Sequence, residues 1–304
     1  MYQHYQHAKT HLKTRNSQIE FLSLSMLHYV ASKKIFNFFE QPVFSPFATA
    51  YPMLQRKILH RYLHCGMSVN KKANAIIDHY TFINKHFTSE SIEHMYFGGS
   101  IHLLQVTVAS ELYTLEIGYS EAFYREGELA LMLIDTENRR IYSIAFSFLK
   151  DKDEHYILIG GMQGPQQTDA SSLELIKTMT KEMHGLRPRN FMIFILRIIA
   201  ASLGIEKITA ITTDNHISKC HRVAFKRFDP FQADYNGYFE EEGGIRKGRF
   251  YILQTEQKRK SIDSIESKKR SLYKKRYTMM DNLSHIVHTK LKSMCDVTNI
   301  GDSI

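Results

Sequence analysis

The sequence feature that most constrains the fold is a series of four apolar segments between residues 111 and 161. The segments are residues 111–119, 128–135, 140–150 and 155–161. The first alternates between apolar and polar side chains, as a half-buried strand does. Polar connectors, such as residues 135–138, are typical of turns. The pattern predicts consecutive antiparallel strands and therefore a sheet at the centre of the protein.

Helices and further strands are predicted after this series. Pro188 can open an apolar helix, and Gly185 and Gly204 can end the two helices of this region. The predicted elements are a helix over residues 171–184, an apolar helix over 188–203, a strand over 207–213, a turn at 240–244 and a strand over 249–253.

The flanks are predicted to be helical, because apolar residues recur there at spacings of three and four. We therefore expect an α+β protein in which a helical N-terminal region packs on an antiparallel-to-mixed sheet core. The predicted regions are the helical region 1–97, the α/β core 98–255 and a basic C-terminal helix over 256–304. The C-terminal helix is expected to dock through Tyr273, Tyr277 and Met280 while its lysines stay in water.

Charge is concentrated at the two ends of the chain. Residues 1–100 hold 11 Lys and Arg against 5 Asp and Glu, and residues 256–304 hold 11 against 6. The middle of the chain is nearly neutral, with 18 against 20. Basic ends favour contact with phosphates, nucleic acid or an anionic surface. The alternative is ordinary solubilising charge on exposed helices.

The cysteines and the hydropathy pattern predict a cytoplasmic protein without a membrane span. Cys65, Cys220 and Cys295 are odd in number and far apart, which argues against disulfides and a thiolate zinc site. We expect no metal site. The longest apolar run, residues 191–203, is too short to span a bilayer. The apolar stretch at 21–32 is expected to be an amphipathic helix, with a cleaved signal peptide as the alternative.

Several blocks of sequence resemble the VirK/YbjX family of Gram-negative bacteria. They are Tyr124 to Leu129, Ile159 to Pro165, His184 to Arg189, Asp234-Tyr235 leading to Gly243-Gly244, and Ser271 to Tyr277. The resemblance covers most of residues 90–290. It implies a role in virulence and in the outer envelope, such as surface display of an outer-membrane virulence factor or resistance to antimicrobial peptides. The implied partner is that surface factor or its transcript.

The order of elements also resembles the acetyltransferase fold that binds coenzyme A. That resemblance implies an anion cradle at Gly160, Gly161, Gln163 and Gly164, whose backbone N–H groups would hold the pyrophosphate of coenzyme A or of another acyl donor. The family's usual glycine motif is missing, and Pro165 removes one N–H donor.

A second anion site is predicted at His184, Arg187 and Arg189. Two guanidinium groups and an imidazole within six residues can clamp a phosphate or a carboxylate. The alternative is that the arginines cap helix carbonyls and pair with surface acids.

Acid–base residues are predicted at two places. His216 and Asn215 follow a strand, where His216 can act as a general base and Asn215 can contact substrate. The alternative is a simple Asx turn. Glu126 and Glu128 can form a carboxylate pair on one face of a strand, with Glu128 in an acid–base role. Their alternative role is a solvated strand start. A nucleophilic Cys220 has no recognisable motif.

Two functions follow from these residues. In the first, a cytoplasmic accessory protein supports envelope or surface-protein maturation through an acyl-transfer step. In the second, a non-enzymatic protein holds RNA or a partner at its basic ends, including an anionic partner at the C-terminal helix.

Overall fold

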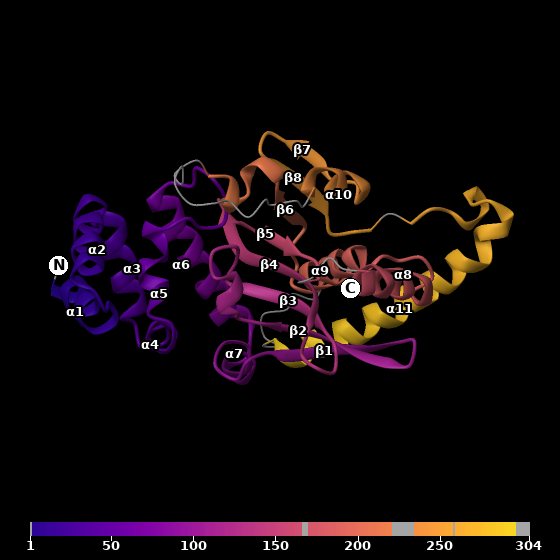
Figure 1. Cartoon of the computed structure of the whole chain (residues 1–304), viewed down its shortest axis with the longest axis horizontal. Coiled ribbons are helices and arrows are strands. Elements are labelled where there is room, and N and C mark those ends of the chain that lie inside the picture. The colour runs from indigo at the N-terminus through magenta and orange to yellow at the C-terminus, as the bar shows by residue number, and fades with distance from the viewer. Residues whose placement is uncertain (1, 166–169, 221–233, 258, 296–304) are drawn as a thin grey trace.

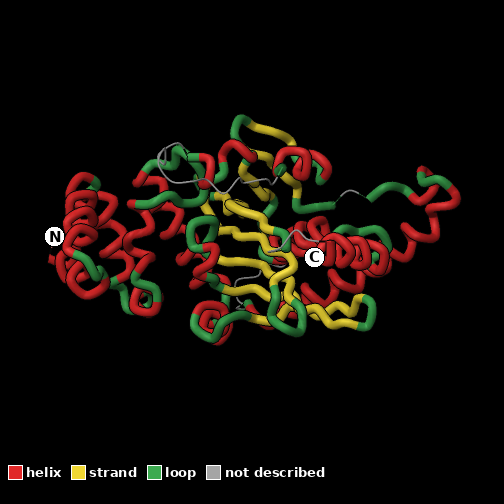
Figure 2. The backbone as a smooth tube through the Cα atoms, viewed as in Figure 1, coloured by secondary structure: helices red, strands yellow, loops and turns green. Residues whose placement is uncertain are grey.

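The computed structural model describes residues 2–165, 170–220, 234–257 and 259–295. A single sheet lies at the centre, with helices on both sides (Figures 1 and 2). From the N-terminal region, α6 (Val69–His86) packs against one face, whereas α1 and α2 lie farther from the sheet; α8, α9 and α11 lie against the other face. Their bounds are Ala170–Glu182, Pro188–Ser202 and Ser267–Met294. The α+β class predicted from the sequence is confirmed.

The N-terminal region is almost entirely helical. Ser68 and Thr88 cap two of its helices, since each side-chain oxygen accepts a backbone N–H three residues later. The helices are α1 (Tyr2–His11), α2 (Arg15–Leu27), α3 (Tyr29–Phe39), α4 (Ser45–Ala50), α5 (Met53–Arg56), η1 (Lys57–Leu59), α6 (Val69–His86) and α7 (Ser89–Tyr96).

The eight strands of the sheet have the order β1-β2-β3-β4-β5-β6-β8-β7. Every neighbouring pair is antiparallel except β5 and β6, which run parallel. The strands are β1 (Ile101–Val108), β2 (Glu111–Gly118), β3 (Leu129–Ile134), β4 (Arg140–Asp151), β5 (Glu154–Gln163), β6 (Lys207–Ile211), β7 (Ile245–Lys247) and β8 (Phe250–Gln254). The four predicted strand segments are therefore β2 to β5.

Three local predictions need correction. The sequence reasoning did not identify β1 or the short strand β7. The predicted turn at 240–244 begins inside a helix, α10 (Tyr235–Glu241), which Asp234 caps by accepting the N–H of Gly237. The basic C-terminal helix starts at Ser267, and the segment before it contains the short helix η5 (Ile262–Ser264).

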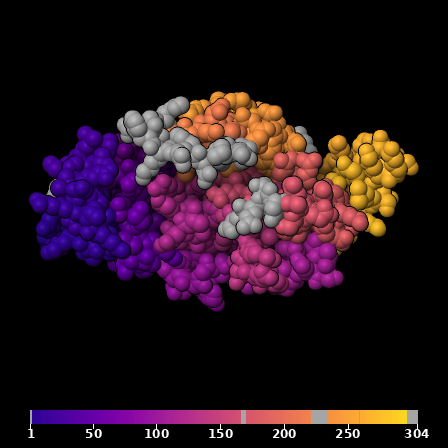
Figure 3. Space-filling model, in the orientation of Figure 1, coloured from indigo at the N-terminus to yellow at the C-terminus, as the bar shows by residue number. Residues whose placement is uncertain are grey.

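The C-terminal helix docks only along its later part. Tyr277 and Met279 pack against the core, and Met280 is buried, whereas Lys274 and Lys275 are exposed. The start of α11 projects from one end of the molecule, opposite the N-terminal helices (Figure 3). The docking expected at Tyr277 and Met280 is confirmed, and Tyr273 is half-buried.

A buried ion pair joins the helical region to the sheet. The ammonium of Lys57, in η1, lies 2.8 Å from both carboxylate oxygens of Glu128, and both side chains are 0% exposed. The hydroxyls of Tyr62 and Tyr80 also donate to this carboxylate. Burial lowers the pKa of Lys57, and the charge of Glu128 opposes that shift. Each buried charge therefore depends on its partner.

Cys65 and Cys220 form a disulfide across 155 residues of sequence, with their Cα atoms 5.5 Å apart. The expectation of unpaired cysteines is therefore wrong at these two positions. The error arose because sequence separation says nothing about spatial distance once a segment of the N-terminal region lies beside the end of β6. Cys295 is a buried free thiol.

Lys57→Met should lower the free energy of unfolding by about 3–5 kcal/mol, because it leaves the Glu128 carboxylate buried without a counter-charge. Lys57→Met combined with Glu128→Gln should lose clearly less than the sum of the two single variants. Urea unfolding of the three variants measures this coupling. Additive losses would mean that the pair does not stabilise the junction between helices and sheet.

Candidate functional site

The candidate site forms where the chain before β3 crosses the end of β5. Three glycines allow the crossing. A Cβ at Gly127 would lie 2.4 Å from the backbone nitrogen of Phe146, and a Cβ at Gly160 would lie 2.0 Å from the carbonyl oxygen of Glu126. A Cβ at Gly161 would lie 2.1 Å from the Glu126 carboxylate. Any side chain at these positions would push Glu126 away from the strand.

A carboxylate, an imidazole and an amide meet at this crossing. Oε1 of Glu126 lies 3.4 Å from Nε2 of His216, and Oε2 lies 3.2 Å from Nε2 of Gln163. The side chain of Glu126 is 12% exposed and that of His216 is 4% exposed. Gln163 ends β5, and His216 follows η3 (Thr213–Asn215), which comes directly after β6. The group therefore lies at the carboxyl ends of the two parallel strands.

The proton on His216 can be placed from its backbone contact. The backbone N–H of Ser218, in η4 (Ile217–Lys219), donates to Nδ1 of His216 over 3.2 Å. A backbone N–H is always a donor, so Nδ1 is the acceptor nitrogen of the neutral ring and Nε2 carries the hydrogen. Nε2, which carries the hydrogen, lies 3.4 Å from Oε1 of Glu126 without hydrogen-bond geometry between the two atoms. In this arrangement the neighbouring carboxylate of Glu126 is the candidate proton acceptor.

Strands β5 and β6 separate next to this group. Their pairing runs from Tyr156↔Lys207 to Ile159↔Ala210 and stops there, although β5 continues to Gln163. The hydroxyl of Tyr235 occupies the opening, accepting the N–H of Met162 over 2.7 Å and donating to its carbonyl over 2.8 Å. Burial raises the pKa of Tyr235, and the nearby charge of Glu126 adds to the shift. Tyr235 thus supplies the hydrogen bonds that β6 no longer gives to β5.

A segment from the N-terminal region closes the other side of the site. The N–H of Leu63 donates to the carbonyl of Arg125 over 2.8 Å, and the N–H of Cys65 donates to the carbonyl of Asn215 over 2.8 Å. Asn215 is fully buried, and its amide donates to the carbonyl of Arg249 over 3.1 Å. The residues beside Glu126 and His216 are therefore both bonded to the same short loop.

The structure brings some of the predicted site residues together. Gln163, Asn215 and His216 lie at the ends of β5 and β6, and Gly161 packs against Glu126. Gly164 lies one residue beyond β5, where a Cβ would make ordinary contact with the Tyr142 ring at 3.5 Å. Glu128 lies away from this group, since it turns into the core toward Lys57.

The His184, Arg187 and Arg189 cluster is divided between two neighbours. Arg187 and Arg189 both contact the carboxylate of Glu241, at 3.4 and 2.5 Å. The backbone carbonyl of His184 instead accepts a hydrogen bond from Arg276 in α11. The two arginines therefore pair with a carboxylate of the protein. Pairing with a surface acid is part of the alternative role considered for them from the sequence.

Tyr235 was missed as a site residue, and Glu126 was considered only as the partner of Glu128. Both belong to the blocks that carry the family resemblance, Tyr124 to Leu129 and Asp234-Tyr235. Spacing could not separate Glu126 from Glu128, because the pair was expected on one strand, whereas β3 starts only at Leu129. His221, next to Cys220 in the sequence, lies outside the described residues. Within the described ranges, no three His, Cys, Asp or Glu side chains gather as a metal site would require.

Fold and site together define an α+β protein with a carboxylate–imidazole pair at the ends of two diverging parallel strands. A family model described as "Protein of unknown function (DUF535)" matches residues 10–289, and the chain belongs to this family. The protein YbjX of Escherichia coli K12, described as uncharacterized, is 27% identical over 235 residues, which cover 77% of this chain and 70% of that protein. The resemblance to the VirK/YbjX family is confirmed.

Two further likenesses were found. "Membrane protein LapB" of Mannheimia haemolytica is 27% identical over 191 residues, covering 62% of this chain and 79% of that protein. A cAMP-binding acyltransferase from Mycobacterium smegmatis aligns in structure with a TM-score of 0.32 and 10% identity, covering 62% of this chain and 54% of that one. Throughout the part of the chain that the structure describes, no helix has the length and apolar character needed to cross a membrane.

Gly160→Ala should destabilise the protein by at least about 2 kcal/mol, because the new methyl group meets the backbone of Glu126. Gly164→Ala is the matched control, and its change should stay within about 0.5 kcal/mol. Thermal and urea unfolding compare the two. Equal effects of both variants would contradict the close crossing at Gly160.

Proposed function

We propose that this protein transfers an acyl group from a thioester to an amine or hydroxyl of an envelope component, with Glu126 as the general base. The observation that carries the proposal is the position of the Glu126 carboxylate. It lies by the carboxyl end of β5, where the pairing with β6 has stopped; Gln163 donates to it over 3.2 Å, and Nε2 of His216 lies 3.4 Å away. A carboxylate oriented by a hydrogen-bond donor is a suitable proton acceptor.

The step balances as follows. Glu126 takes the proton of the attacking amine or hydroxyl, and the freed electron pair forms a bond to the thioester carbon. The carbon–sulfur bond breaks, and the thiolate leaves and is protonated by solvent. His216 is a positioning residue in this scheme, because its buried ring lies beside the base, with Nε2 3.4 Å from Oε1 of Glu126. Coenzyme A is the proposed source of the thioester.

The envelope part of the proposal has separate support. The resemblance to the VirK/YbjX family implies a role in surface display and antimicrobial-peptide resistance, and one relative carries the name "Membrane protein LapB". We propose that an outer-membrane virulence factor or a lipid of the envelope either accepts the acyl group or depends on the transfer for its function.

A second candidate function is retention of a transcript or another anionic partner at α11. The exposed lysines near its start favour this, because Lys274 and Lys275 form no ion pair among the described residues and Lys268 and Lys269 share a single carboxylate, that of Glu266. Nucleic acid that copurifies with the protein, seen as excess absorbance at 260 nm, would favour this function over acyl transfer.

Glu126→Gln should lower thioester cleavage of acetyl-, octanoyl- or palmitoyl-coenzyme A by about 100-fold, because the amide cannot accept the proton. His216→Ala should cost about tenfold, since it only loosens the base. Release of the coenzyme A thiol is measured with a thiol reagent. Exposed Glu121, five residues earlier, supplies the matched control Glu121→Gln, which should keep the full rate.

The same variants can be tested in cells without knowing the acceptor. A deletion strain that carries Glu126→Gln should be as sensitive to antimicrobial peptides as the deletion itself, while Glu121→Gln should restore resistance. Full resistance with Glu126→Gln at normal protein levels would contradict a base role for Glu126.

We also propose that the protein acts in the cytoplasm, and the disulfide makes this testable. Cytoplasmic thiols are kept mostly reduced, so in that compartment the Cys65–Cys220 bond of the structure should be open, and both cysteines should accept an alkylating label directly after acid quenching and denaturation of intact cells. Mass spectrometry reads the label on each cysteine, with Cys295 as the internal positive control. Labelling of Cys295 alone would place the chain in an oxidising compartment.

A further inference from the structure

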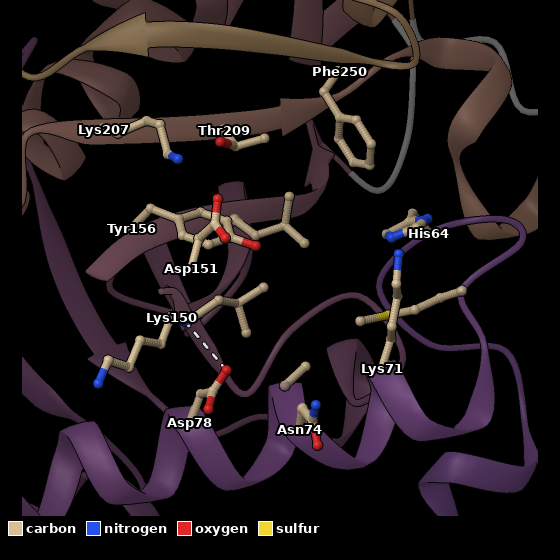
Figure 4. Close-up of a pocket in the computed structure, with 14 residues that line it drawn as sticks. His64, Lys71, Asn74, Asp78, Lys150, Asp151, Tyr156, Lys207, Thr209 and Phe250 are labelled. Atoms are coloured by element: carbon tan, nitrogen blue, oxygen red, sulfur yellow. Dashed lines mark hydrogen bonds between the residues drawn. The ribbon is translucent and has the colours of Figure 1, made fainter. Parts of the chain in front are cut away.

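Two neighbouring cavities meet at His64 and Met67 on the side of the sheet that faces α6. The first has a volume of about 450 Å³ and lies between α6 and strands β4, β5, β6 and β8 (Figure 4). The second has a volume of about 740 Å³ and lies over the Cys65–Cys220 disulfide. Because both are lined by His64 and Met67, we treat them as one groove and call it the His64 groove.

The first cavity is lined by apolar and aromatic side chains together with polar and charged ones, among them Asp78 and Asp151. The ring of His64 meets the ring of Phe250 edge-on, with their centroids 5.1 Å apart. The ammonium of Lys207 lies 4.7 Å from the centre of the Tyr156 ring, across the cavity from Asn74 (Figure 4). Leu149 and Leu158 also line the cavity. The apolar and aromatic part of this lining suits a flat or apolar body.

The second cavity is rich in positive charge. Its cations are Arg61, Lys72, Lys219 and Arg249, against two acids, Glu20 and Asp214. The guanidinium groups of Arg61 and Arg249 each donate to a backbone carbonyl, both over 3.4 Å, and within the described residues neither pairs with a carboxylate. A guanidinium has five N–H donors, so each arginine keeps donors for an anion in the cavity.

The cations converge on the junction between the two cavities. Burial lowers the pKa of His64, and the positive charges of Arg249, Lys71 and Lys72 lower it further, against a hydrogen bond to the Cys65 carbonyl. Lys71 reaches toward His64 from α6 (Figure 4). The junction is therefore a region of positive potential in which the imidazole itself stays uncharged near neutral pH.

We propose that the His64 groove binds a small molecule with a diphosphate group on an apolar or aromatic body, the diphosphate lying by Arg61 and Arg249 and the body against Tyr156 and Phe250. The cavity volumes match those of small-molecule sites. The proposal does not depend on acyl transfer, because none of these residues belongs to the Glu126 group.

Calorimetric titration at low salt tests this binding with inorganic pyrophosphate as the first probe. Arg61→Gln with Arg249→Gln should weaken the affinity at least about tenfold, because two charge-assisted contacts are lost. Arg246→Gln removes an exposed arginine outside both cavities and is the matched control, with unchanged affinity expected. Arg249→Lys with Arg61 intact should recover part of the affinity, which separates binding from a folding defect.

Two larger probes identify the body of the ligand. Tighter binding of ADP than of pyrophosphate would indicate a nucleotide, and tighter binding of geranyl diphosphate would indicate a lipid-linked diphosphate; either result supports the proposal. Pyrophosphate binding that is absent, or that Arg246→Gln weakens as much as the double variant does, would overturn it. Such a failure would leave the Glu126→Gln result on thioester cleavage untouched, so the two proposals can fail separately.

Discussion

The buried ion pair of Lys57 and Glu128 is the interaction on which the rest of the structure depends. It connects the last helical turn before residue 60 to the start of β3, inside a core where neither charge reaches water. With η1 and the start of β3 fixed in this way, the loop that carries Leu63 and Cys65 lies against the ends of β5 and β6. The same loop bears one half of the disulfide and His64. Both the Glu126 group and the His64 groove are therefore assembled by one junction.

The charges of the two candidate sites explain why they are separate. At Gly161, the space that a side chain would fill holds the carboxylate of Glu126, which disfavours an anion at this part of the loop. The arginines predicted as a second anion clamp already hold Glu241. The available positive charge instead gathers in the His64 groove. The proposed proton acceptor and the proposed anion site therefore consist of different residues.

The sequence predicts the sheet well because its signals are local. Alternation and turns locate β2 to β5, and Pro188 and Gly204 bracket α9 within a residue or two. Asn215 and His216 were predicted as site residues because they follow a strand, and Gln163 because of the resemblance to the acetyltransferase fold. The anion roles given to Gly161, Gln163 and Gly164, and the three-region division of the chain, stay predictions. The Cys65–Cys220 bond and the Lys57–Glu128 pair could not be predicted, because their partners are 155 and 71 residues apart in the sequence, respectively.

Amide hydrogen exchange at Leu63 and Cys65 tests most directly whether the buried pair holds this junction together. In the unaltered protein both amides should be protected nearly as strongly as those of β4, because the Leu63 amide donates to the carbonyl of Arg125 and the Cys65 amide to that of Asn215. In the Lys57→Met/Glu128→Gln protein their protection should fall by at least about tenfold while that of β4 is kept. Unchanged protection at Leu63 and Cys65 in that variant would contradict the account.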